Sequence, residues 1–269
     1  MRHSLLCAIA LALVLTPGAP AQEQTPSGVP SASTAAEKLS PRQSAELRAD
    51  ILMARKEFVD AIRAYDEILK SDPKNAQILN KVGIAYEELP DLGRAERYFK
   101  KAMREDKTFA SAINNLGTVE YMKKRYGKAA DYYKKALELH TEMGAIYVNL
   151  GYAYLEDKKY PEAMTAFGNA LKVDPSVFER KEGGGTIVQQ RSTSDPGLFY
   201  FFIAKNYALA GDAEHAAHYL KMARDDGYKE FASAAKDPSF SKVIKDPRVQ
   251  EVLTVVPSYA VDRHKMPGN

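Results

Sequence analysis

The sequence of 269 residues has one cysteine, no tryptophan and almost no excess of charge of either sign. Its single cysteine, Cys7, lies near the N-terminus, so the rest of the chain has no disulfide, no thiolate metal site and no cysteine nucleophile. The 38 basic residues nearly balance the 35 acidic residues, which leaves a net charge of +3. Such a balance gives no overall field for a polyanion, and the composition therefore argues against binding of nucleic acid.

Motifs of catalysis, nucleotide binding and metal binding are missing as well. The triple glycine at 183–185 lacks the Lys-Ser or Lys-Thr of a phosphate-binding loop, and no Gly-x-Ser-x-Gly element occurs. His215 and His218 are three residues apart and Glu214 precedes both, unlike the His-Glu-x-x-His of zinc proteases. We therefore predict that the chain is not an enzyme and has no catalytic residues, no metal site and no cofactor.

Long apolar runs are also scarce, and the one that stands out is close to the N-terminus. Residues 5–16 are uncharged and largely apolar, Arg2 and His3 precede them, and Ala19-Pro20-Ala21 follows them. This order is typical of a secretory signal peptide, and the run is too short to cross ~30 Å of hydrocarbon. We expect cleavage near Ala21 and an exported protein, periplasmic or secreted, with no membrane span in the mature chain.

The chain does contain an internal repeat, and its period is 34 residues. Four columns share this period: Gly83, Gly117 and Gly151; Ala61, Ala95, Ala129 and Ala163; Tyr65, Phe99, Tyr133 and Phe167; Ala102, Ala136 and Ala170. Within a unit these residues recur at spacings of three and four, which indicates two amphipathic helices. Glycine and alanine allow the two helices to approach closely, and the stacking of neighbouring units completes a core that one pair cannot bury.

This pattern resembles the tetratricopeptide repeat. The unit at 144–177 carries nearly the whole signature of that family: Tyr147, Leu150, Gly151, Tyr154, Ala163, Phe167, Ala170 and Pro175. A further pair is out of register with the others: Tyr200, Ala204, Tyr207, Gly211, Ala216, Leu220 and Ala223. The resemblance implies an all-α superhelical solenoid of about five helix pairs with a C-terminal helical cap.

The predicted organisation follows from these patterns. Residues 1–21 are the signal peptide, and residues 22–41, rich in Pro, Ser, Ala and Thr, are a flexible linker. Four repeats at 42–178, a Gly-rich insertion at 179–197, a fifth pair at 198–226, a helical cap at 227–258 and a tail at 259–269 complete the chain. Thr186-Ile187-Val188 favours a short strand or extended segment, and short helices are expected to begin at Pro238 and Pro247.

The resemblance also implies a binding site, because in this family the first helix of each pair lines a concave groove. We predict that partner contacts in the groove are made by six residues: Asn80, Asn114, Asn115, Tyr121, Asn149 and Tyr152. An asparagine amide both donates and accepts hydrogen bonds, so it can hold a peptide backbone. As the alternative, the asparagines bridge neighbouring repeats and the tyrosines pack between first helices. The same mapping also places Gln77, Lys81, Ile84 and Glu87 of the second repeat in the groove.

The expected function is a non-catalytic interaction scaffold that binds a partner protein or an extended peptide in the groove. A clamp for acidic chaperone C-termini needs cations in successive repeats, and the corresponding positions hold Ile84, Ala145 and Asn149, so we exclude that ligand class. Two alternatives stay open: a structural component of an envelope or secretion assembly, and an enzyme built around the insertion.

Overall fold

A computed structural model describes residues 39–179 and 193–254 of the chain. The predicted signal peptide, almost all of the predicted linker, Thr186-Ile187-Val188 and the predicted tail lie outside these ranges. Within the described ranges every regular element is helical and no strand occurs, which confirms the predicted all-α fold class.

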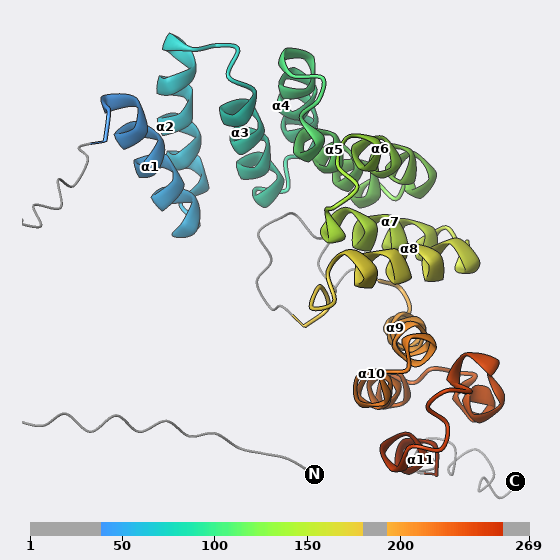
Figure 1. The fold of residues 1–269 in the computed structure, drawn as a ribbon. Coiled ribbons are helices and arrows are strands. Elements are labelled where there is room, and N and C mark those ends of the chain that lie inside the picture. Colours follow the sequence, from blue (N-terminus) through green and yellow to red (C-terminus); the bar gives the residue numbers. More distant parts are fainter. Residues whose placement is uncertain (1–38, 180–192, 255–269) are drawn as a thin grey trace, which may run out of the picture. The chain divides into compact units, whose positions relative to one another are not determined.

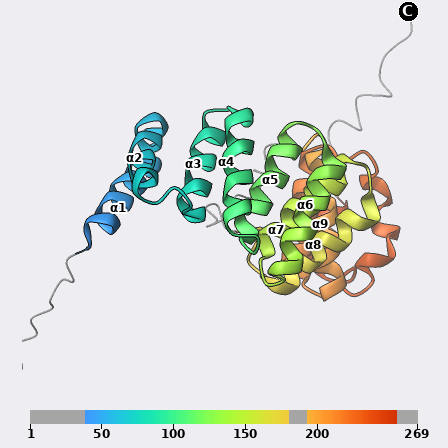
Figure 2. The ribbon, with the colours of Figure 1, turned by 90° about the horizontal axis from the view of Figure 1, so that it is seen from above.

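Ten helices form five consecutive pairs (Figure 1). They are α1 (Pro41–Ala54), α2 (Phe58–Ser71), α3 (Ala76–Glu88), α4 (Leu92–Glu105), α5 (Ala110–Met122), α6 (Tyr126–Leu139), α7 (Gly144–Glu156), α8 (Tyr160–Val173), α9 (Pro196–Ala210) and α10 (Ala213–Asp225). Each first helix packs on the second helix of its own pair, and each second helix packs on the next pair. Figure 2 shows this succession from α1 to α4 in a second view. The described part of the chain is therefore a solenoid of helix pairs.

The 34-residue columns place a glycine of each first helix beneath an aromatic ring of its second helix. A Cβ atom added at Gly83, Gly117 or Gly151 would lie 2.3–2.5 Å from the nearest ring carbon of Phe99, Tyr133 or Phe167, respectively. No real Cβ contact is that short, so the close approach of the two helices requires glycine. The alanines of the second helices at 61, 95, 129 and 163 are fully buried, as their column predicts.

Beyond the fifth pair, the chain continues as η2 (Phe231–Lys236), η3 (Pro238–Phe240) and α11 (Pro247–Thr254). The predicted short helices at Pro238 and Pro247 are thus present. α11 packs on α10 and η3 packs on α9, so Phe240 and Val249 are buried. α9 begins at Pro196, two residues before the predicted start, because Asp195 caps it by accepting a hydrogen bond from the Leu198 N–H at 2.9 Å.

The turn inside three of the pairs has a lysine in a left-handed backbone conformation. The φ angles are +62° at Lys56, +58° at Lys124 and +59° at Lys158, whereas Gly211 takes this conformation in the fifth pair at +87°. A side chain at such a φ angle costs about 1 kcal/mol, and glycine avoids that cost.

We therefore expect Lys124→Gly to raise the free energy of unfolding by about 0.5–1 kcal/mol. Lys135→Gly is the matched control, because Lys135 is an exposed residue within α6 and glycine there should cost about 1 kcal/mol. Urea titration followed by circular dichroism compares the two variants with the natural chain. Destabilisation of both would contradict the expectation for Lys124.

Candidate functional site

Four of the predicted site residues form a chain of amide hydrogen bonds across three repeats. Asn115 of α5 donates from Nδ2 to Oδ1 of Asn80 of α3 at 3.0 Å. Asn149 of α7 donates in the same way to Asn114 of α5 at 3.0 Å, and Asn114 donates to the Asn115 oxygen at 3.1 Å. All four side chains are buried. We call this set the amide network.

The amide network ties α3, α5 and α7 to one another, as the bridging alternative expects. It contains three hydrogen bonds, each from an amide N–H group of one asparagine to the amide oxygen of another. Each amide has two N–H groups and an oxygen with two lone pairs, so the network retains capacity for further hydrogen bonds. Direct contact of these asparagines with a partner stays a prediction.

The two predicted tyrosines are also buried. Tyr121 packs edge-on against Tyr126, with ring centroids 5.3 Å apart. Tyr152 is 0% exposed and lies against Phe167 and Phe199, at centroid distances of 5.7 and 4.9 Å. Burial raises the pKa of both phenols far above its ordinary value, so both remain neutral at physiological pH. The positions match the packing alternative, and contact with a partner stays a prediction.

We expect Asn115→Ala to lower the free energy of unfolding by about 2 kcal/mol, because it leaves Asn80 Oδ1 and Asn114 Nδ2 without these hydrogen bonds inside the protein. Asn169→Ala on α8 is the control, since Asn169 is half-buried and lies outside the network. Equal urea midpoints for the two variants would show that the network contributes nothing to stability. If the Asn115–Asn80 bond carries the effect, the double variant with Asn80→Ala should lose less than the sum of the single losses.

Glu87 of α3, which the sequence did not single out, is one of two described residues with a buried side-chain oxygen that has no hydrogen-bond partner, and Tyr152 is the other. Its position along the 34-residue period is taken by Met53, Tyr121 and Leu155 in the other repeats. The Glu87 Oε2 atom is buried and has no hydrogen-bond partner among the described residues. Desolvation, and then the neighbouring charge of Glu88, raises the pKa of Glu87 to about 8. The one signal available in the sequence was a carboxyl group in an otherwise apolar column.

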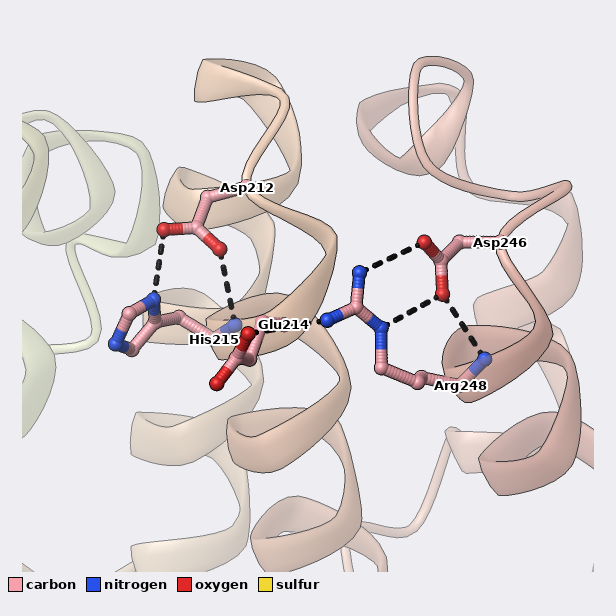
Figure 3. A network of polar contacts seen from close by, with 5 residues as sticks. All are labelled: Asp212, Glu214, His215, Asp246 and Arg248. Carbon is pink, nitrogen blue, oxygen red and sulfur yellow. Dashed lines mark hydrogen bonds and ion pairs between the residues drawn. The ribbon is translucent and has the colours of Figure 1, made fainter.

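A second polar cluster lies at the C-terminal cap (Figure 3). Asp212 accepts from the backbone N–H of His215 at 3.1 Å and pairs with its Nδ1 at 2.7 Å. Arg248 of α11 binds Asp246 at 2.9 Å and reaches Glu214 of α10 at 3.1 Å. These contacts cap α10 and join it to α11, so the cluster has a structural explanation.

His215 contacts two carboxylates, whereas His218 does not join them. His218 is exposed, and His215 pairs through Nε2 with Glu179 at 3.1 Å while its ring stacks on Tyr207. In residues 39–179 and 193–254, no group of three His, Cys, Asp or Glu side chains could hold a metal ion. Among the same residues, no helix has the length and apolar character needed to cross a membrane.

Comparisons with known proteins agree with this architecture. Two family models match the chain, both described as tetratricopeptide repeat, one at residues 46–108 and 91–143 and the other at residues 120–178. A search of the curated proteins found no match.

The search of solved structures matched this chain to several proteins, and three of them are described here. PilF of Pseudomonas aeruginosa has a TM-score of 0.53 at 18% identity, over 79% of this chain and 86% of that chain. MamA has a TM-score of 0.47 at 26% identity, over 68% and 95% of the two chains. YrrB, described as a TPR protein with an unusual peptide-binding site, has a TM-score of 0.46 at 21% identity, over 71% and 90%. From its paired helices, its 34-residue columns and the matched family models, the chain belongs to the tetratricopeptide-repeat family.

Proposed function

We propose that this protein is a non-catalytic scaffold that binds an extended segment of a partner protein along the face formed by α3, α5 and α7. Tetratricopeptide repeats are a general scaffold for protein–protein interaction and are typically not catalytic. The observation that carries the proposal is the amide network, because it holds equivalent faces of three successive repeats in one register.

The spacing of the repeats suits an extended ligand. Packed helices lie about 8–10 Å apart, and an extended chain rises about 3.3 Å per residue. A segment of about three residues would therefore meet each repeat, and its backbone would meet a similar set of groups every third residue.

A library of random 12-residue peptides, displayed on phage and selected on the full chain, tests this proposal. Enriched peptides are then made with a photoreactive benzophenone side chain, and the cross-linked residues are identified by mass spectrometry. We expect cross-links on α3, α5 and α7. Cross-links on the second helices α4, α6 and α8, or a selection that enriches no peptide, would overturn the proposal.

We propose in addition that the scaffold acts outside the cytoplasm, on the ground that residues 1–21 have the order of a signal peptide. Expression of the full chain in a bacterium with two membranes tests this idea. Intact mass measurement of the periplasmic fraction should give a chain that begins at Gln22. A chain that stays in the cytoplasm and begins at Met1 would refute it.

A further inference from the structure

Glu87 interrupts an apolar column of the first helices. The equivalent residues Tyr121 and Leu155 are buried, and Met53 is half-buried. A carboxyl group at such a position costs free energy unless a partner compensates for its lost hydration. A residue that breaks a local rule without compensation inside the protein is expected at a functional site.

The carboxyl group lacks the basic partner that three other acidic side chains of the first helices have. Glu46 and Asp50 of α1 both bind Lys81 of α3, at 2.7 and 2.8 Å. Glu120 of α5 pairs with Arg125 at 3.4 Å. Glu87 Oε2, by contrast, has neither a hydrogen bond nor an ion pair with any residue in the described part of the chain, although the atom is buried.

No basic side chain of the described residues forms an ion pair with Glu87. Glu88, the next residue, adds a negative charge, and the charge of Glu87 acts on Tyr133 of α6. The Tyr133 hydroxyl already donates to Thr118 Oγ1 at 3.3 Å. Desolvation raises the pKa of Glu87 to about 8, which is what a carboxyl group shows when no positive charge stabilises it.

We infer that Glu87 binds a positively charged side chain, lysine or arginine, of the partner segment and thereby selects basic partners. This inference rests on the proposed function and names the chemistry of its ligand. A guanidinium or ammonium group would give Oε2 its missing hydrogen bond. It would also favour the ionised form of the carboxyl group, and such an ion pair is strong in a poorly hydrated place.

Phage selection of random 12-residue peptides on three proteins tests the inference: the natural chain, Glu87→Gln and Glu88→Gln. Glutamine keeps the shape of the side chain and removes its charge, and the exposed Glu88 is the matched control. We expect a lysine or arginine to be enriched at one position on the natural chain and on Glu88→Gln. Fluorescence anisotropy should then show that a selected peptide binds Glu87→Gln at least ~10-fold more weakly, as the loss of a charged hydrogen bond requires.

Glu87→Leu is a second variant, chosen because Leu155 fills the equivalent position of the fourth repeat and the variant should therefore fold. Peptides selected on Glu87→Leu should show no enrichment of lysine or arginine, as is expected for Glu87→Gln. The affinity is then measured for peptides with lysine, arginine or citrulline at the basic position. Lysine and arginine show which cation is preferred, and citrulline, which is uncharged, shows whether the charge is needed.

The outcomes separate the inference from the proposed function. Peptides that bind α3, α5 and α7 but lack a basic position, and that bind Glu87→Gln as tightly as the natural chain, would overturn the role of Glu87 alone. A selection that enriches nothing on any of the three proteins would overturn the scaffold proposal, and the role of Glu87 with it. Carbon-13 NMR of the Glu87 carboxyl group gives an independent result, since a bound cation should lower its titration midpoint.

Discussion

Gly151→Ala is expected to lower the free energy of unfolding by about 2–3 kcal/mol, although it adds a single methyl group. The new Cβ atom would lie 2.3 Å from Cε1 of Phe167. That ring is fully buried and is held edge-on by Tyr152 and Phe199, so it cannot swing away without moving two other rings. α7 and α8 would have to separate, and the packing of the fourth repeat on α9 would weaken with them.

Gly127→Ala on α6 is the matched control, because nothing lies within 4 Å of its added Cβ atom. Alanine there should leave stability unchanged or raise it by about 0.5 kcal/mol. Urea unfolding followed at 222 nm measures both variants. The double variant Gly151→Ala/Phe167→Leu should regain part of the loss if the clash with the ring is its cause. Equal midpoints for Gly151→Ala and Gly127→Ala would refute the explanation.

Glu87→Gln is expected to stabilise the protein by about 4 kcal/mol at pH 8 and by less than about 1 kcal/mol at pH 5. The pKa of Glu87 is raised from an ordinary value of 4.5 to about 8 in the folded chain. As the pH rises from 4.5 to 8, the unfolded chain releases this proton while the folded chain keeps it. The natural protein therefore loses stability over that window, and the variant has no such group to titrate.

Thermal unfolding at pH 5 and pH 8 measures the effect, with Glu138→Gln as the control on the exposed surface of α6. The difference in stability between Glu87→Gln and the natural chain should be several times larger at the higher pH. If the difference is the same at both values, the carboxyl group is not held in its neutral form. A basic peptide bound at Glu87 should reduce the difference, because it removes the cause of the raised pKa.

The 34-residue columns predicted the fold because each column corresponds to one contact. Gly83, Gly117 and Gly151 mark the closest approach within a pair, and the structure places an aromatic ring at each. The pair at α9 and α10 was also predicted from its own spacing, although it is out of register. The start of α9 differed by two residues, since Asp195 rather than the apolar pattern decides where that helix begins.

The candidate site was predicted less completely. The asparagines map to the expected helices, but Asn115 bonds Asn80 and Asn149 bonds Asn114, at offsets of 35 residues rather than 34. That offset depends on the rotation of one helix pair relative to the next. The 34-residue columns of the sequence do not specify this rotation. The burial of Tyr152 depends on Phe199, a residue beyond the insertion and outside the period. The lack of a partner for Glu87 follows only from the positions of its neighbours.

The two ends of the described solenoid differ in how they are closed. At α1 only Ala49 is buried, and Leu47 and Ile51 are 48% and 43% exposed, whereas α9 and α10 are covered by η3 and α11. Because each pair of a solenoid is stabilised mainly by its neighbours, local opening should begin at α1 and progress toward the covered end. α3, the helix of Glu87, is the first helix of the proposed binding face that such opening reaches. A partner bound across α3, α5 and α7 would oppose this local opening. It would therefore stabilise the N-terminal half of the solenoid, which is less protected.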